Sequence, residues 1–421
     1  MTSLFANNRL IVTGILDVIT PLLVGSGEGK DEVSLEHDGE KSEASQIITD
    51  SDGKPYIPGS SLKGALRALA VGKPESAKLF GEPHGDSGNM GLLTVYGASF
   101  KEAPKLSHVP YYDQKSATGI DARTAIDGAT GTAAANKLFH ERRVSPEAKF
   151  NFHCELILLN NTNVEDLLGR LLGSLMDGFA LGRGKGAGQG RVKLSGVVIL
   201  EVKGITETGD WGPVTAKHEV KVDPNHRLGD LPKPIKLKLT CNGPYLVNDP
   251  SWEKDYYTES KEKRKTLPTM KALGMKEGVT AQAILPGTSL KGVLRSRCAW
   301  LEACAGGNEE KLTKELFGST DAAGLLRIEE IRCQHQGQAR LSSVKLDRFS
   351  GAPIERALFS TQCFVNPVFN VDLKFSDRES EADRTQLCDL LRRLWDDLKE
   401  NGIILGHGGN HGFGWCRAEI I

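Results

Sequence analysis

Several features that would assign a function directly are absent from this sequence. Its eight cysteines never fall in a Cys-x-x-Cys pair, so neither a zinc ribbon nor a thioredoxin-type redox site is supported, and we expect reduced, structural cysteines. No apolar run reaches the roughly 20 residues that a membrane-spanning helix needs. Residues 1–14 also lack the basic and apolar regions of a secretory signal. We therefore expect a cytoplasmic protein with no membrane partner.

Excess charge and the common nucleotide-binding loops are absent too. The net charge is −1, which excludes a whole-surface attraction for nucleic acid but leaves room for a basic groove between acidic faces. The stretch "GRGKGAGQGR" does not have the Gly-x-Gly-x-x-Gly spacing. The stretch "GSGEGKDE" is one residue too short for a P-loop and has Asp31 where Ser or Thr is required.

What the chain does contain is an internal repeat. "YIPGSSLKGALR" at 56–67 returns as "AILPGTSLKGVLR" at 283–295. Three further pairs follow in the same order: "KLFGEP" with "ELFGST", "IDGATGTAAANKLF" with "LDRFSGAPIERALF", and "LGRGKGAGQGRV" with "LGHGGNHGFGWC". A chain of 421 residues has room for two domains. The repeat predicts a duplication with a first domain at 1–208, a linker rich in Pro, Gly and charge at 209–233, and a second domain at 234–421.

Each half has the same expected order of elements. An alternating apolar stretch is followed by the PGSSLKG helix, a strand such as "FNFHCELIL" or "VFNVDLKF", a helix with 3.6-residue periodicity, and a final strand. This order predicts an α+β fold of two tandem ferredoxin-like (RRM-like) domains. Residues 119–141, rich in Ala, Gly and Thr, predict a protruding thumb hairpin with Phe139 anchoring its base. Phe359 is expected to do the same in the second half.

The PGSSLKG motif suggests a phosphate site. Proline and glycine set a turn, Ser60 or Ser61 caps the helix, and the first N–H groups point outward at the positive end of the helix dipole. The lysine and the arginine of each motif are four residues apart, so they lie on the same face of the helix. We predict that RNA is bound by these residues and by the cations of the glycine-rich loops and hairpins: Ser60, Ser61, Lys63, Arg67, Arg123, Arg183, Lys185, Thr288, Ser289, Lys291, Arg295, Arg348 and His407. A capped helix with a solvated basic face, and glycines that only allow tight packing, are the alternatives.

Taken together, "YIPGSSLKGALR", "LFG", the Ile-Asp-x-x-x-Gly hairpin ending in Leu-Phe, and the terminal glycine-rich loop resemble the RAMP superfamily. The resemblance is to the backbone subunits of type III CRISPR effectors, here as a fusion of two. It implies a palm that grips the CRISPR guide RNA, a thumb hairpin that displaces a base, contact with target RNA and with other type III effector subunits, and cleavage of target RNA supported by a loop aspartate.

The sequence departs from this family at that aspartate. The matching position in the first half is Ala44, beside Glu43, and in the second half it falls near Met270 or Lys271. We expect the acid to come from elsewhere in the same loops: Asp38 in the first half and Asp249 in the second, with Asp31 and Glu43 as further candidates. Such an acid acts as a base or holds a divalent ion such as Mg2+ at the scissile phosphate.

Three functions follow from these observations. The first is a double backbone subunit that binds guide and target RNA and contributes target-RNA endonuclease sites. The second is a scaffold that binds RNA without cutting it, which Ala44 favours. The third is a RAMP ribonuclease that processes precursor guide RNA, with His37 or His407 as general base.

Overall fold

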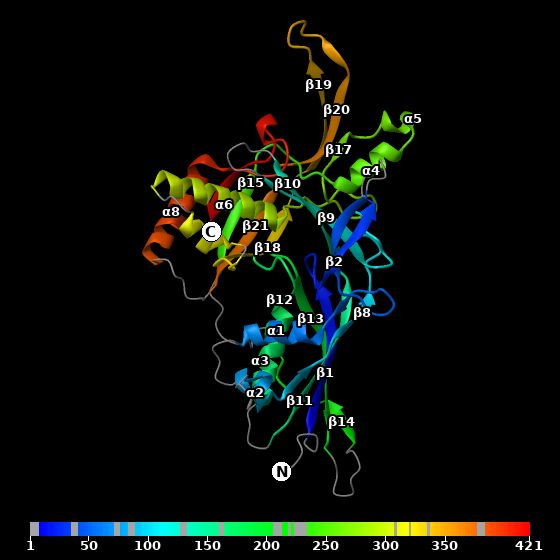
Figure 1. Cartoon of the computed structure of the whole chain (residues 1–421), viewed down its shortest axis with the longest axis vertical. Helices are drawn as coiled ribbons and strands as arrows, with labels where there is room; N and C mark the ends of the chain where they lie inside the picture. The colour runs from blue at the N-terminus through cyan, green and yellow to red at the C-terminus, as the bar shows by residue number, and fades with distance from the viewer. Residues whose placement is uncertain are drawn as a thin grey trace.

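In the computed structural model, the described parts of the chain are residues 8–34, 41–70, 76–82, 89–126, 133–159, 164–204, 213–217, 220–222, 234–306, 310–319, 321–334, 337–376 and 384–421. Two α+β units follow one another along the long axis of the molecule (Figure 1). No helix within these described ranges is long and apolar enough to cross a membrane.

The palm of the first half is a ferredoxin-like sheet. Strand β1 (Arg9–Val18) lies between β11 (Lys149–Ile157) and β13 (Arg191–Val202), and β7 (Leu93–Val95) and β8 (Ala98–Glu102) pair with the far side of β11. Helices α1 (Gly59–Leu69) and α3 (Val164–Asp177) provide the two crossovers. Alternate residues of β1, including Leu10, Val12 and Leu16, are fully buried, as the period of a half-buried strand requires.

The second half repeats this order. Strand β15 (Ile235–Cys241) lies between β21 (Val368–Phe375) and β23 (Trp415–Ile420), and β18 (Leu326–Gln334) pairs with β21. The crossover helices are α6 (Gly287–Cys304) and α8 (Arg384–Asn401). Each half has its own apolar core. The sheet order, together with the two cores, confirms the predicted α+β architecture of two tandem ferredoxin-like units.

Short elements complete both palms. In the first half they are β4 (Tyr56–Ile57), α2 (Ser76–Phe80), β5 (Gly81–Glu82), β6 (Asn89–Met90) and β12 (Phe179–Ala180). In the second half they are β16 (Pro244–Tyr245), α4 (Pro250–Thr258), α5 (Lys261–Arg264), β17 (Met270–Lys271), α7 (Lys311–Phe317), β22 (Ile403–Ile404) and the 3-10 turn Gly409–His411. Helices α4 and α5 follow one another between β16 and β17.

Both thumb hairpins are present. In the first half β9 (Thr118–Ile126) pairs with β10 (Ala133–Val144), and β2 (Gly25–Ser34) and β3 (Lys41–Ile47) extend this sheet along β10. In the second half β19 (Gly337–Leu346) pairs with β20 (Pro353–Val365). Figure 1 shows β19 and β20 projecting beyond the second palm. Phe139 and Phe359 are 47% and 43% exposed, so these phenylalanines do not anchor the hairpin bases in the cores.

Two findings differ from the expectations for the linker and the cysteines. Strand β14 (Val214–Lys217) pairs with β13, and Val220 and Val222 pack on the first core, so part of the expected linker contributes to the first half. Cys241 and Cys416 form a disulfide between β15 and β23, whereas the other six cysteines are free. Two residues that lie 175 apart in the sequence carry no local signal that would pair them.

Candidate nucleic-acid interface

The two PGSSLKG helices begin in the same way. Pro58 and Pro286 are the N-cap residues of α1 and α6, and neither helix has a side-chain cap hydrogen bond. The expected capping by Ser60 or Ser61 is therefore wrong, because the helix already begins at Gly59 and both serines lie in its first turn. Thr288 and Ser289 occupy the same positions in α6. Backbone N–H groups of a first turn have no partner within their own helix and can donate to an anion.

The arginine of each motif has a structural partner. Arg67 donates to the carbonyl oxygen of Gly81 at 2.5 Å, and Arg295 donates to that of Gly318 at 2.7 Å. These glycines close the two Leu-Phe-Gly motifs and have φ of 79° and 90°, which a residue with a side chain rarely adopts. The arginines thus tie the PGSSLKG helix to the Leu-Phe-Gly turn, which explains why both motifs recur together.

The glycine-rich loop of the first half, residues 181–190, packs onto the second half. Gly186 accepts a backbone hydrogen bond from Ile328 of β18 at 3.1 Å, and Ala187 forms a parallel bridge with Ile328. A Cβ on Gly287, at the start of α6, would lie 2.1 Å from the carbonyl oxygen of Ala187. Tight packing, one of the two alternatives for this loop, is therefore present, and it joins the two halves.

This packing gathers cations from both halves, and we call Lys185, Lys291 and Arg327 the junction cluster. Burial and the charge of Arg327 lower the pKa of Lys185. Burial, Arg295 and Arg327 lower the pKa of Lys291, whose Nζ lies 3.0 Å from a Cβ placed on Gly186. Among the ion pairs of the described residues, none includes Lys185, Lys291 or Arg327. Lys185 and Arg327 are exposed, and Lys291 is partly buried. Within the part of the chain that the structure describes, no acid neutralises these three cations, which suits a phosphate.

The cations expected on the first thumb have a different environment. Arg143 is buried, 1% exposed, and pairs with Glu141, while its Nε lies 3.5 Å from Asp121. Arg123 pairs with Asp121 at 2.8 Å and with Glu141 at 3.3 Å. These four residues form a neutral network at the base of the hairpin, so Arg123 is held by protein carboxylates.

The tip of the second thumb is open. Arg348 is exposed, and Phe349 beside it is 95% exposed. Asp347 accepts hydrogen bonds from the backbone N–H groups of Phe349 and Ser350, which closes the turn and turns Phe349 outward. An exposed aromatic ring beside a cation is an arrangement that stacks on a base.

The acid expected in the first half is absent from the position that the resemblance indicates. Ala44 is fully buried and packs with Ile120 and Tyr111. Asp31 of β2 is directly opposite Ala44 in the strand register, and Glu43 is exposed on β3. Asp38 and His37 lie outside the described residues.

The matching position in the second half is also not acidic. Ala44 lies beside His140 on β10, and the residue equivalent to His140 in the second half is Ser360, which exchanges hydrogen bonds with Thr269. Thr269 is therefore the counterpart of Ala44, one residue before the expected Met270. Asp249 caps α4, where it accepts from the Ser251 N–H at 3.0 Å and from the Ser251 hydroxyl.

Among those expected residues that the structure describes, we find neither a metal centre nor a histidine–acid pair. The described ranges contain no group of three or more His, Cys, Asp or Glu side chains placed to hold a metal ion. His407 is exposed, and its backbone N–H donates to Leu246 at 2.7 Å. Arg183 is also exposed, and its backbone N–H donates to Leu23 in the same manner at 2.9 Å. These two hydrogen bonds fasten the glycine-rich loop of each half to its own palm.

Two features of the site were not recognised from the sequence. Arg327 joins the junction cluster only because the glycine-rich loop crosses to β18. A further repeat, "GLL" at Gly91–Leu93 and Gly324–Leu326, places each glycine against the Leu-Phe-Gly turn, since a Cβ would lie 2.3 Å from the Leu79 carbonyl or 2.4 Å from Phe317. This second signal was present in the sequence and would have linked the strand to the turn.

Comparison with known proteins agrees with the repeat. The family model described as "RAMP superfamily" matches residues 15–193 and 273–417, one region in each half. The chain is also similar to the protein named "CRISPR system Cms endoribonuclease Csm3" from Enterococcus italicus, with 26% identity over 206 residues that cover 44% of this chain and 89% of that relative. On these two matched regions, the chain belongs to the RAMP superfamily.

Proposed function

We propose that this protein is a double subunit of a type III CRISPR effector that binds guide RNA along its two palms and positions target RNA. The observation that carries the proposal is the junction cluster. Lys185 from the first half meets Lys291 and Arg327 from the second, and none has a carboxylate partner among the described residues.

The two halves share one continuous site in this arrangement. The glycine-rich loop that carries Lys185 packs against the start of α6, and the N-terminus of a helix is a favourable place for a phosphate. A phosphate bound here contacts both domains at once and fixes their spacing on the RNA. The exposed Phe349 and Arg348 at the tip of the second thumb supply a stacking ring and a cation farther along the strand.

The partners proposed from the family are guide RNA, target RNA and other type III effector subunits. The relative's name places it in a CRISPR system, which supports this assignment. The halves interact through backbone atoms of the glycine-rich loop and, elsewhere, through the Tyr111 hydroxyl, which donates to the carbonyl oxygen of Pro250 at 2.7 Å. The second half carries a matching loop, residues 405–414, in which Asn410, His411 and Gly412 are exposed, and we propose it as the contact for a neighbouring subunit.

The experiment is reconstitution of the effector with guide RNA, followed by photocrosslinking and peptide identification. We expect crosslinks in residues 181–190 and 287–295, and a reduced amount of guide retained by Lys185→Ala/Lys291→Ala. The matched control is Lys149→Ala/Lys238→Ala, because these lysines pair with Glu102 and Glu419 on the surface. Equal guide retention by both double variants would refute the proposal.

Target-RNA cleavage is a second proposed activity, and one observation favours it. Asp31 is opposite Ala44 in the β2–β3 register, so the strand beside the expected position carries an acid. Cutting requires a carboxylate near a displaced nucleotide, where it acts as base or holds a divalent ion such as Mg2+.

The cleavage test uses the complex with labelled target RNA and compares Asp31→Ala, Asp38→Ala, Glu43→Ala and Asp249→Ala. Loss of one cut without loss of target binding would assign an acid to that cut. Unchanged cutting in all four variants would leave this chain as an RNA-binding scaffold. Processing of precursor guide RNA by the isolated protein, sensitive to His407→Ala, would instead support the ribonuclease alternative.

A further inference from the structure

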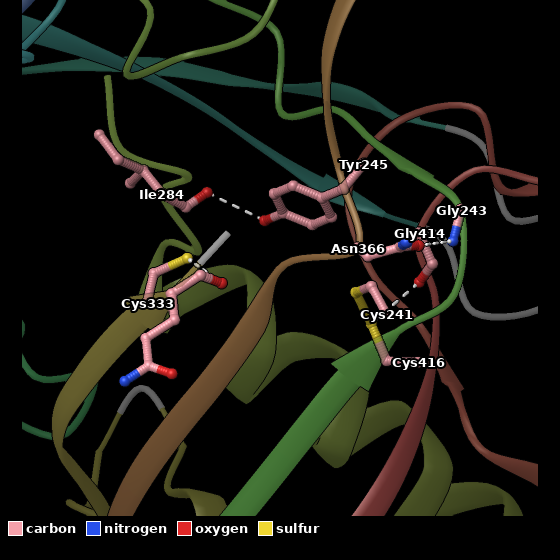
Figure 2. Close-up of a disulfide and its surroundings, with 9 residues drawn as sticks. Cys241, Gly243, Tyr245, Ile284, Cys333, Asn366, Gly414 and Cys416 are labelled. Atoms are coloured by element: carbon pink, nitrogen blue, oxygen red, sulfur yellow. Dashed lines mark hydrogen bonds between the residues drawn. A yellow bond between two sulfur atoms is a disulfide. The ribbon is translucent and has the colours of Figure 1, made fainter. Parts of the chain in front are cut away.

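The disulfide between Cys241 and Cys416 occupies a special place in the duplicated fold. The two cysteines are directly opposite each other in the pairing of β15 with β23, and they are 1% and 0% exposed. Figure 2 shows the bond joining these two strands, with Gly243 and Gly414 nearby on two separate segments. It links the first and last strands of the second palm.

The first half shows what this position requires. Pro21 and Pro244 begin equivalent segments of the two halves, so Cys241 corresponds to Val18. The last strand aligns through Leu181 and Leu405, so Cys416 corresponds to Val192. Val18 and Val192 are likewise directly opposite in the β1–β13 register and are buried. An aliphatic pair therefore satisfies the packing, and the cysteine pair adds a bond that the core does not need.

The bond lies at the root of the second glycine-rich loop. The backbone N–H of Leu405 donates to the carbonyl oxygen of Gly414 at 2.9 Å. Gly414 donates to Pro244 at 2.8 Å, and Asn242 donates to Trp415 at 3.1 Å. Gly243 donates to the side chain of Asn366 at 2.7 Å, which connects the segment that follows Cys241 to the base of the second thumb (Figure 2). Holding Cys416 against Cys241 therefore restrains the loop 405–414 and the strand that follows it.

We propose that Cys241 and Cys416 form a reversible disulfide. When it is formed, this bond restricts local opening of the loop 405–414 and of β23. On its outer side β23 pairs with only two residues of β22, Ile403 opposite Cys416 and Ile404 opposite Trp415. Opening of this short pairing gives a small-molecule disulfide access to Cys416.

The reaction is thiol–disulfide exchange. One cysteine thiolate attacks the sulfur–sulfur bond of oxidised glutathione, which forms a mixed disulfide and releases one reduced glutathione. The second cysteine attacks the mixed disulfide, forms the Cys241–Cys416 bond and releases the second. Two protein thiols are oxidised, one small-molecule disulfide is reduced, and the two protons pass to the released thiols.

The test equilibrates the full chain in glutathione buffers of different ratio and then alkylates it, before and after reduction. In oxidising buffer we expect Cys241 and Cys416 to be protected while the six other cysteines react after denaturation. In reducing buffer all eight react. Hydrogen exchange of residues 403–420 should be at least about tenfold slower in the oxidised protein.

Two variants make the result specific. Cys241→Val/Cys416→Val copies the first half's valine pair and should fold, with exchange that does not respond to the buffer. Cys304→Ser/Cys388→Ser removes two exposed cysteines and should keep the wild-type response. The proposal is overturned if both cysteines alkylate as thiols at every ratio, if the bond forms without slowing exchange, or if the valine variant responds as the wild type does.

Discussion

The carbonyl oxygen of Ala187 lies 2.1 Å from the position that a Cβ would take on Gly287, so the two halves are in contact at a point where only a hydrogen atom fits. This contact sets the loop of the first half against the first turn of α6. It is the reason that Lys185 and Lys291 share one space.

Gly287→Ala should therefore separate the halves at the junction. Overpacking of a close contact costs about 1–3 kcal/mol, so we expect a lower unfolding midpoint and faster proteolysis within residues 181–190. Gly292→Ala is the control, because a Cβ there meets nothing within 4 Å and alanine favours a helix by about 1 kcal/mol. Equal stability of the two variants would contradict a close contact between the halves at Gly287.

Arg295→Ala should lower stability because it removes the hydrogen bond to Gly318. A hydrogen bond from a charged donor is worth roughly 1.5–3 kcal/mol, measured here by denaturant unfolding. Lys291→Ala on the same face should leave the unfolding free energy nearly unchanged and weaken RNA binding instead. If both variants weakened RNA binding equally without loss of stability, Arg295 would be an RNA ligand and its structural role would be wrong.

As the pH rises, RNA affinity at the junction cluster should begin to fall at a lower pH than it would at lysines with an ordinary pKa. Burial and neighbouring arginines lower the pKa of Lys185 and Lys291, so the uncharged form appears below the ordinary lysine value of about 10.4. Because the lowered pKa disfavours the charged form in the free protein, stability without RNA rises through that pH range while RNA affinity falls. Lys185→Arg/Lys291→Arg should hold its affinity to higher pH, and an unchanged profile in this variant would contradict the assignment.

The ion network under the first thumb gives a stability prediction. Arg143→Ala leaves Glu141 buried without its main partner, which should cost about 3–5 kcal/mol in chemical denaturation. The second half has Thr361 and Cys363 at the equivalent positions and needs no ions there. Glu141→Thr/Arg143→Cys should therefore be less destabilising than Arg143→Ala alone. The opposite order would show that the network is needed as a unit.

The repeat was sufficient to predict the fold and the approximate interface. Four ordered landmarks predicted two domains, and the period of the apolar residues predicted the strands and helices around each core. The sequence could not show that Arg67 and Arg295 bind carbonyl groups, because hydrogen bonds to backbone leave no trace in residue type. The prediction that Ser60 or Ser61 caps the helix was wrong because the helix begins at Gly59, before either serine.

The contacts between the halves could not be predicted from the sequence. Arg327 has no motif around it and becomes part of the site only through the crossing of residues 181–190 to β18. The Cys241–Cys416 bond likewise follows from strand register, which a duplicated pattern predicts only once the valine pair of the first half has been aligned with it.

The measurement that tests the central claim most directly is the salt dependence of guide-RNA affinity for the wild type and for Lys185→Ala/Lys291→Ala. Each phosphate contact with single-stranded RNA contributes about −0.7 to the slope of log affinity against log salt. If both lysines bind phosphate, the slope of the double variant should be shallower by about 1.4. An identical slope and affinity in the two proteins would show that RNA does not bind at the junction.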